Sequence, residues 1–335
     1  MPNTANNFAG TTDIHRLSSV IDDALRSLRI SGSLLLRETY ASPWSIAIPN
    51  AEKLAALLDV TSPIRVVAFH LIEFGHFAIK PEGGDEVVLN AGEMIICFGG
   101  DAHRLFQGEP SEAQSLESLL AGGVNIQSPP LRIRSKGAAL LCGVFMLEHT
   151  VFNPLFAALP PMMYSTLSRS GEMHNLSGVA RLLAEEVDRR SLGGGYVIER
   201  LLEVLCAESI RAHIESVSRQ ETSWFRGVKD PVVGRAIAAI HERPGESWSV
   251  KKLADDVAIS PSRFAARFAE ALGDSPMAYV AKWRMNVACG QLATTRQSID
   301  QVASSVGYES QAAFSRAFKK YVGISPAVWR GSANL

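Results

Sequence analysis

Short apolar runs separated by turn residues dominate the first third of the chain. The runs are rich in valine, isoleucine and phenylalanine, and turn residues such as Pro81-Glu82-Gly83-Gly84 and Gly99-Gly100-Asp101 break them. Several short strands at this spacing predict an antiparallel barrel or sandwich. The expected strands are residues 33–40, 44–48, 65–74, 76–80, 86–89, 94–98 and 137–145, and residues 107–130 are expected to form a long loop.

The pattern changes to a helical period in the middle of the chain. Residues 175–191 place leucines and valines about 3.6 residues apart, Gly193-Gly194-Gly195 ends this helix, and residues 196–216 form a second one. Two amphipathic helices need a partner surface, which is either their own domain or, in addition, a second copy of the chain. The polar residues 217–229 are expected to form a linker, and the chain after Asp230-Pro231 is helical in pattern to near its end.

An internal duplication fills residues 249–335. Ser249 and Ser298 begin two similar segments 49 residues apart, and most later pairs lie 50 residues apart because the second copy has one insertion. Phenylalanines spaced four residues apart mark one face of a helix in each copy. The matching pairs are Val257/Val306, Phe264/Phe314, Phe268/Phe318, Gly273/Gly323 and Pro276/Pro326.

Each copy has the pattern of a helix–turn–helix. In the first, Ser260 can cap a helix that Pro261 starts, and in the second, Ser298 and Gln301 have the spacing of a capping box. The helix between the copies, residues 276–293, would extend about 27 Å, which is close to one turn of DNA, about 34 Å. Two recognition helices on one chain are thus expected to enter adjacent major grooves.

With the phenylalanines facing the core, the outward positions of the second helix of each unit are candidates for contacts with DNA. Arginine can bind guanine with two hydrogen bonds and glutamine can bind adenine in the same way, whereas lysines suit phosphates. The alternative is that these are ordinary solvated helix positions. The candidates are Ser262, Arg263, Ala266, Arg267, Ser310, Gln311, Ala312, Ser315, Arg316 and Lys319.

Composition and charge fit a DNA-binding protein of two or three domains. The chain has 335 residues, 47% hydrophobic and 20% charged, and it contains no apolar run of 18 residues, so no membrane span is expected. Four cysteines without CxxC spacing give no disulfide pattern, and the cytoplasm is the expected compartment. The net charge of −1 divides into +5 for residues 229–335 and −6 for residues 1–228, which favours a polyanionic partner for the last part.

Residues 230–330 resemble the DNA-binding domain of AraC/XylS-type transcriptional regulators. The resemblance rests on the two helix–turn–helix units and on the stretch VGYESQAAFSRAFKKYVGISPAVWR, Val306–Arg330, which is close to the family signature. It implies a sequence-specific transcription factor, most often an activator, that binds double-stranded promoter DNA and works with RNA polymerase. Ala266 departs from the larger polar residues that often occupy this position, which weakens the base contacts expected of the first recognition helix.

The front of the chain resembles a cupin-like sensing domain. In VVLNAGEMIICFGGDAHRL, Val87–Leu105, Gly92, Gly100 and His103 match the second cupin motif, whereas phenylalanine and glutamine replace its proline and asparagine. The HxH and the glutamate of the first motif are missing. Together with the segments FHL, GGDAH, LLCG and FNPLFAALP, this pattern resembles the cupin-type ligand-binding domain of one subgroup of AraC-type regulators.

These resemblances imply a multidomain fold, with an N-terminal mostly-β cupin-like barrel plus helices and a C-terminal all-α double helix–turn–helix. The expected domains are residues 1–165 for sensing, 166–220 as a helical segment that can support dimerisation, 221–229 as a linker and 230–335 for DNA binding. A small-molecule effector would bind inside the barrel. Candidate lining residues are Phe69, Phe77, Ile96, Phe98 and Phe145.

Four residues of the barrel are candidates to converge on a metal ion. They are His70, Asp101, His103 and Cys142, expected on strands or at strand ends. Imidazole, carboxylate and thiolate together suit Zn²⁺ better than a redox iron. The alternative is a lone histidine at a turn and a small buried cysteine in a strand. Cys97 is expected to be an ordinary core residue.

The sequence thus predicts a cytoplasmic transcriptional regulator without enzymatic activity. Its cupin-like domain would sense an unidentified small molecule or a metal, and the chain would form a homodimer through its helical segment. The alternative is a cupin-type metalloenzyme with a DNA-binding tail, against which the missing HxH and glutamate argue. A third hypothesis is an architectural DNA-binding protein, but a modest +5 charge and two recognition helices favour specific binding.

Overall fold

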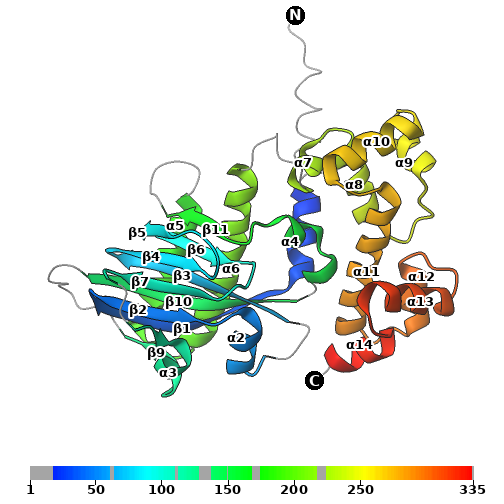
Figure 1. The fold of residues 1–335 in the computed structure, drawn as a ribbon. Coiled ribbons are helices and arrows are strands. Elements are labelled where there is room, and N and C mark those ends of the chain that lie inside the picture. Colours follow the sequence, from blue (N-terminus) through cyan, green and yellow to red (C-terminus); the bar gives the residue numbers. More distant parts are fainter. Residues whose placement is uncertain are drawn as a thin grey trace, which may run out of the picture. The chain divides into compact units, whose positions relative to one another are not determined.

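The computed structural model describes residues 18–60, 64–109, 112–127, 137–148, 150–167, 174–216 and 224–333. The chain divides into two compact units. The β unit comprises residues 30–147 and 159–216, and the helical unit comprises residues 1–29, 148–158 and 217–335. All labelled strands belong to the β unit, and helices α7 to α14 belong to the helical unit (Figure 1).

Two sheets form the β unit. The six-stranded sheet has the order β11-β6-β3-β10-β1-β9, and the five-stranded sheet has the order β5-β4-β7-β2-β8. The strand pairs are antiparallel, except that the short β9 and β8 run parallel to β1 and β2. The bounds are β1 Ile30–Ala41, β2 Trp44–Ile48, β3 Arg65–Phe74, β4 His76–Pro81, β5 Val87–Asn90, β6 Glu93–Cys97, β7 His103–Gln107, β8 Gln114–Ser115, β9 Asn125–Ile126, β10 Gly137–Leu147 and β11 Met163–Thr166.

The seven predicted strands are present, with ends that differ from the prediction by three residues at most. The predicted long loop over residues 107–130 is wrong in part, because it contains β8, α3 (Leu116–Leu120) and β9. Ser115 caps α3 by accepting a hydrogen bond from the backbone N–H of Ser118. The pattern also does not predict α2 (Ala51–Leu57), a short helix that Asn50 caps in the same way.

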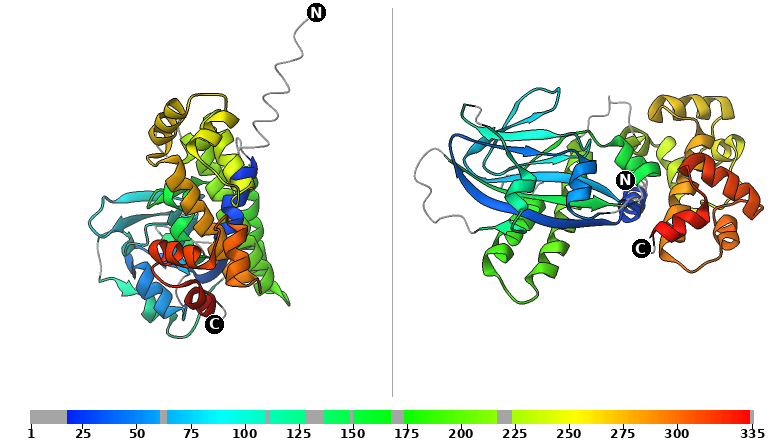
Figure 2. Two further views of the ribbon diagram at one scale, coloured as in Figure 1. Left: turned by 90° about the vertical axis from the view of Figure 1, so that its right-hand side faces the viewer. Right: turned by 60° about the horizontal axis from the view of Figure 1, so that its bottom comes forward.

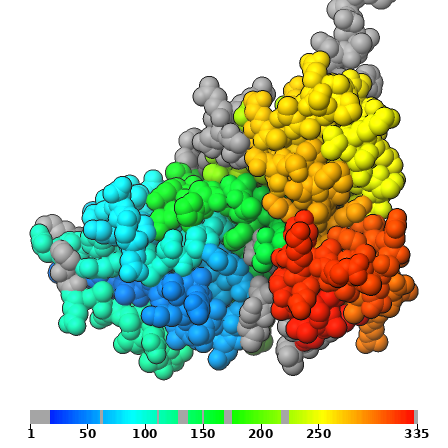
Figure 3. Space-filling view, turned by 45° about the vertical axis from the view of Figure 1, so that its right-hand side comes forward, coloured from blue at the N-terminus to red at the C-terminus, as the bar shows by residue number. Residues whose placement is uncertain are grey.

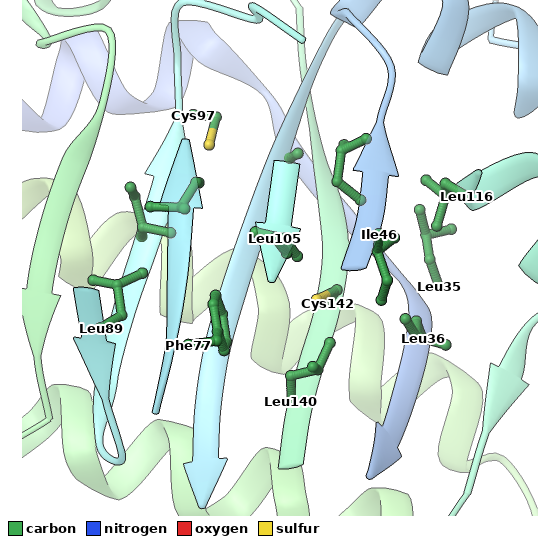
Figure 4. Close-up of a cluster of buried hydrophobic side chains, with 14 of the residues drawn as sticks. Leu35, Leu36, Ile46, Phe77, Leu89, Cys97, Leu105, Leu116, Leu140 and Cys142 are labelled. Carbon is green, nitrogen blue, oxygen red and sulfur yellow. The ribbon is translucent and has the colours of Figure 1, made fainter. Parts of the chain in front are cut away.

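The interior between the two sheets is a hydrophobic core. Residues that pair across antiparallel strands point to the same face, and the pair Val144 and Ala68 belongs to this core. The pair Cys142 and His70 lies two residues further along the same strands and therefore faces the same interior. Figure 4 shows Cys142 among the interior side chains with Phe77 of β4, and both belong to the buried cluster.

The opposite face of the six-stranded sheet carries α5 (His174–Arg189) and α6 (Gly194–Ser216), with α6 packed on β1 and β10. Gly32 permits this approach, since a Cβ there would lie 2.6 Å from the Cβ of Leu202 on α6. Phe145 pairs with Gly32 and stacks on Phe69 with ring centroids 4.5 Å apart. The prediction that Phe69 and Phe145 line the interior is therefore wrong, whereas Phe77 does lie there.

Helices build the other unit, and two helix pairs lie at opposite ends of α11 (Figures 1 and 2). The predicted linker is wrong over residues 224–229, which form α7 because Trp224 and Phe225 bury their rings. Residues 217–223 lie outside the described residues. The bounds are a helix over residues 18–28, η1 Thr150–Phe152, α4 Pro154–Ala158, α7 Trp224–Lys229, α8 Val233–Glu242, α9 Val250–Asp256, α10 Pro261–Leu272, α11 Pro276–Thr294, α12 Ile299–Ser305, α13 Gln311–Val322 and α14 Pro326–Ala333.

Candidate DNA interface and buried histidine–cysteine cluster

The first helix–turn–helix unit consists of α9 and α10. Phe264 and Phe268 are fully buried on one side of α10, as their spacing predicts, and Gly273 ends the helix in the left-handed conformation with φ 72°. Ser260 occupies the N-cap position, but its side chain makes no capping hydrogen bond, so the predicted cap is only positional. The packing leaves one face of α10 exposed to solvent, with Ser262, Arg263, Ala266 and Arg267 on it.

The second unit consists of α12 and α13 and repeats this construction. The predicted capping box is confirmed, because Ser298 Oγ accepts from Gln301 N at 3.1 Å and Gln301 Oε1 accepts from Ser298 N at 2.7 Å. Ser310 caps α13 by accepting from Ala313 N at 3.2 Å, so its hydroxyl has a structural partner. With Phe314 and Phe318 buried, the opposite face exposes Gln311, Ala312, Arg316 and Lys319, and leaves Ser315 half-buried.

Helix α11 joins the two units. Its 19 residues extend about 28 Å at 1.5 Å per residue, which suits the predicted separation of two adjacent major grooves. Figure 3 shows both units on the surface of the helical unit, with α9 and α10 in yellow and α12 and α13 in orange to red. The candidate DNA-binding residues thus lie on two separate exposed helices that one long helix connects.

Among the candidate DNA-binding residues, Arg267 is held by an ion pair. Its guanidinium donates from Nε and Nη2 to both carboxylate oxygens of Asp230, at 2.9 to 3.1 Å. Asp230 also accepts from the backbone N–H groups of Val232 and Val233 at the start of α8. Burial raises the pKa of Asp230, but the Arg267 bonds and these two N–H groups outweigh it and leave the pKa below its usual value. Arg267 therefore ties α10 to α8.

A chain of close contacts joins one cysteine and two histidines in the core of the β unit. Cys142 Sγ on β10 lies 2.9 Å from His70 Nδ1 on β3, and His70 Nε2 lies 2.8 Å from His103 Nε2 on β7. His103 Nδ1 lies 3.0 Å from the backbone oxygen of Asp101. His70 and His103 are only 1% and 5% exposed, so the cluster is sealed from bulk water.

The backbone oxygen of Asp101 fixes the tautomers of this cluster. Because a carbonyl oxygen only accepts, His103 donates from Nδ1 and accepts at Nε2. His70 then donates from Nε2 to His103 and accepts the thiol proton of Cys142 at Nδ1. Burial lowers the pKa of both histidines and raises the pKa of the Cys142 thiol, so the three groups are neutral in this arrangement.

The same cluster presents three donor atoms that face one another. One ring nitrogen each of His70 and His103 and the Sγ of Cys97 all lie within 4.8 Å of each other. A tetrahedral zinc with bonds of about 2.05 Å to nitrogen and about 2.3 Å to sulfur separates two nitrogens by about 3.3 Å and a nitrogen from a sulfur by about 3.6 Å. The distances here are 2.8 Å between the two Nε2 atoms and 3.9 Å from Cys97 Sγ to His103 Nε2, so these two separations differ from the tetrahedral values by about 0.5 Å and about 0.3 Å.

Of the four predicted ligands, His70 and His103 belong to this group of three donor atoms, and the structure adds Cys97, which the sequence predicts to be an ordinary core residue. Cys142 contacts Nδ1 of His70, whereas it is Nε2 of the same ring that contacts His103. Asp101 is exposed and contacts His103 through its backbone oxygen. Cys142 and Asp101 therefore orient the two histidine rings in this arrangement.

Comparison with known proteins supports the resemblances on which the sequence analysis relied. A family model described as Cupin matches residues 19–215, and a model described as Helix-turn-helix domain matches residues 253–332. The HTH-type transcriptional regulator AlkR of Acinetobacter baylyi is 28% identical over 267 residues, 78% of this chain and 86% of that protein. The Arabinose operon regulatory protein of Escherichia coli is 37% identical over 84 residues, 25% of this chain and 29% of that protein.

Among solved structures, ToxT from Vibrio cholerae matches 92% of this chain and 98% of its own chain, at 12% identity and a TM-score of 0.36. Within the described ranges, none of the helices combines the length and the apolar composition that a membrane span requires.

Proposed function

Since this chain belongs to the cupin family and carries the helix–turn–helix domain of AraC-type transcriptional regulators, we propose that it regulates transcription by binding a two-part site in promoter DNA. The observation that carries the proposal is the pair of helix–turn–helix units on α11, each with an exposed polar face. We assign DNA binding to residues 230–335 and sensing to residues 1–165.

Helix α13 supplies most of the base contacts in this proposal. The first turns of a recognition helix reach base edges, and Gln311 and Arg316 are the exposed side chains there that can form paired hydrogen bonds with a base. Lys319, further along the helix, suits a phosphate. Helix α10 contributes less, because Ala266 is short and Arg267 is held by Asp230, which leaves Arg263 as its free guanidinium for a base.

The test is binding of the full-length protein to two duplexes of equal length. One carries a site recovered by selection from random DNA, and the other has the same base composition in scrambled order. Specific DNA-binding proteins prefer their sites by about 10³-fold or more. Fluorescence anisotropy should show at least this ratio at physiological salt, and equal affinity for both duplexes with a steep salt dependence would instead support the architectural hypothesis.

We propose that the β unit senses a soft divalent cation of the zinc class. His70, His103 and Cys97 would hold the ion, which leaves a fourth coordination position inside the buried cluster. With His70 Nε2 turned to the ion, its Nδ1–H would donate to Cys142, and His103 would keep its bond to the Asp101 oxygen. A bound ion would therefore fix the relative positions of β3, β6 and β7, and this is the physical link from the ion to the fold.

The buried position of the cluster favours a regulator over the alternative, a cupin-type metalloenzyme. A catalytic metal needs an open position that a substrate can reach, and His70 and His103 are 1% and 5% exposed. We therefore propose that the chain has no enzymatic activity. Turnover of a candidate substrate by metal-loaded protein, abolished by His103→Ala, would support the enzyme instead.

We further propose a homodimer that uses the helical hairpin α5–α6. Large apolar side chains are exposed along it, and a symmetric partner would cover them. These side chains are Leu182, Leu192, Tyr196, Val197 and Val204. We also propose that RNA polymerase is a partner of this chain and that the chain works in the cytoplasm. Light scattering of the full chain tests the dimer, and Tyr196→Glu should shift the measured mass to that of a monomer.

A further inference from the structure

Arg284, near the middle of α11, is bonded to both helix–turn–helix units at once. Its Nε donates to the backbone oxygen of Pro244 and its Nη2 donates to that of Glu246, each at 2.8 Å. Both acceptors lie in the loop that leads into α9 of the first unit. Its Nη1 donates to the backbone oxygen of Gly307 at 3.4 Å, in the turn between α12 and α13 of the second unit.

The two loops that Arg284 holds also contact each other directly through their backbones. A Cβ on Gly245 would lie 2.5 Å from the oxygen of Ser305, and a Cβ on Gly307 would lie 2.6 Å from the oxygen of Gly245. Gly307 in addition has φ 80°, which a residue with a side chain rarely adopts. The loop before α9 and the turn before α13 therefore approach at a distance that glycine alone permits.

The chemistry of this contact is specific for arginine. All three acceptors are neutral backbone oxygens, and burial lowers the pKa of the Arg284 guanidinium, opposed by Tyr308, whose ring it overlies at 5.8 Å. A planar guanidinium can direct Nε and Nη2 to two acceptors in fixed directions, whereas a lysine ammonium is a point charge on a flexible stem. The contact thus fixes direction as well as distance.

We propose that Arg284 is a positioning residue that sets the spacing and angle between the two recognition helices, and with them the spacing of the DNA half-elements. This rests on the proposed function of the helical unit. Because Arg284 binds the loop before α9 and the turn before α13, α10 and α13 cannot rotate independently about α11. The DNA must bend or twist to meet both helices, and sequences that deform with difficulty between the half-elements are disfavoured.

The experiment measures the affinity of the full-length protein for duplexes with the selected site, with one base pair inserted between the half-elements, and with one removed. One base pair moves a half-element by about 3.4 Å and rotates it by about 34°. Wild-type protein should lose at least about tenfold in affinity on either change. Arg284→Lys, which keeps the charge, should bind the original site about tenfold more weakly and discriminate the three spacings by less than about threefold.

Two comparisons complete the test. Arg296→Lys, at an exposed arginine of the same unit, should keep the wild-type spacing profile. Gly245→Ala, which forces the two loops apart without touching Arg284, should broaden the profile as Arg284→Lys does, and it replaces that variant if the latter does not fold.

The outcomes separate the two proposals. If Arg284→Lys and Gly245→Ala bind all sites more weakly but keep the wild-type spacing preference, the positioning role is overturned while DNA binding stands. If wild-type protein itself prefers no two-part site, the proposed function of the helical unit fails. Binding to a duplex with one half-element only should stay within about twofold of wild type in Arg284→Lys, since its recognition helices are intact.

Discussion

His241 on α8 should make the stability of the helical unit depend on pH. Its ring stacks on Trp283 with centroids 3.5 Å apart and an angle of 2° between the planes. Its Nε2 lies 2.8 Å from the hydroxyl of Tyr279, and that hydroxyl accepts a hydrogen bond from Trp224 Nε1 at 2.9 Å. The tyrosine proton is therefore free to be donated to Nε2, which requires a neutral histidine.

Burial lowers the pKa of His241 to about 3, against an ordinary value of 6.5. The unfolded chain binds a proton near pH 6.5 while the folded chain does not, so the stabilising contribution is complete above pH 6.5 and is lost as the pH falls toward 3. Each pH unit below 6.5 lowers the free energy of unfolding by about 1.4 kcal/mol. The loss is therefore about 1.4 kcal/mol at pH 5.5 and about 2.7 kcal/mol at pH 4.5.

His241→Phe provides the test, because phenylalanine keeps the stack on Trp283 but does not titrate. At pH 7 the variant should be less stable by about 1–3 kcal/mol, since the Tyr279 hydroxyl loses its acceptor. Below a crossing point near pH 5 it should be more stable than wild type. Urea unfolding followed by tryptophan fluorescence measures this, because four of the five tryptophans lie in the helical unit. Parallel pH profiles for the two proteins would refute the assignment of a neutral buried His241.

Three further changes test other parts of the account. Arg316→Ala should weaken binding to the selected site by about 1–3 kcal/mol and leave scrambled DNA almost unaffected in anisotropy titrations; an equal loss on both duplexes would exclude base recognition by this residue. In elemental analysis after zinc loading, Cys97→Ser and His103→Ala should lower the amount of zinc per chain. Cys142→Ser should still bind one zinc per chain, but with weaker affinity. A zinc content that depends on Cys142 alone would contradict the ligand assignment. Phe318→Ala should destabilise the helical unit by about 3–5 kcal/mol in urea unfolding, and a change below about 1 kcal/mol would show that its burial does not hold α13 in place.

The helix–turn–helix units were predictable because their information is local. The spacing of Phe314 and Phe318 defines the buried face of α13 within one helix, and the capping box of Ser298 and Gln301 defines the start of α12. Because of the duplication, the same local pattern occurs in both copies, so two matching segments support the prediction. The helix α7 was not predictable in the same way, because Trp224 and Phe225 follow a polar stretch and form a helix only through burial against α8 and α10.

The alternation of apolar and polar residues along the strands does not predict which residues form the ligand set of the buried cluster. Strands β6 and β10 are buried on both faces, so their sequences are continuous apolar runs in which inward and outward positions look alike. Cys97 and Cys142 were therefore equivalent in the sequence, and only the register of β6 and β10 against β3 distinguishes them. His70 and His103 were found because a histidine inside an apolar strand or in a cupin motif stands out by its chemistry.

Selection of bound sequences from random DNA by the purified full-length protein shows whether the two helix–turn–helix units bind one two-part site. Two recognition helices held at the ends of α11 predict a recovered motif of two half-elements about one helical turn apart, with a fixed number of base pairs between them. A motif with a single element, or two elements at variable spacing, would contradict a DNA-binding domain with two rigidly connected recognition helices.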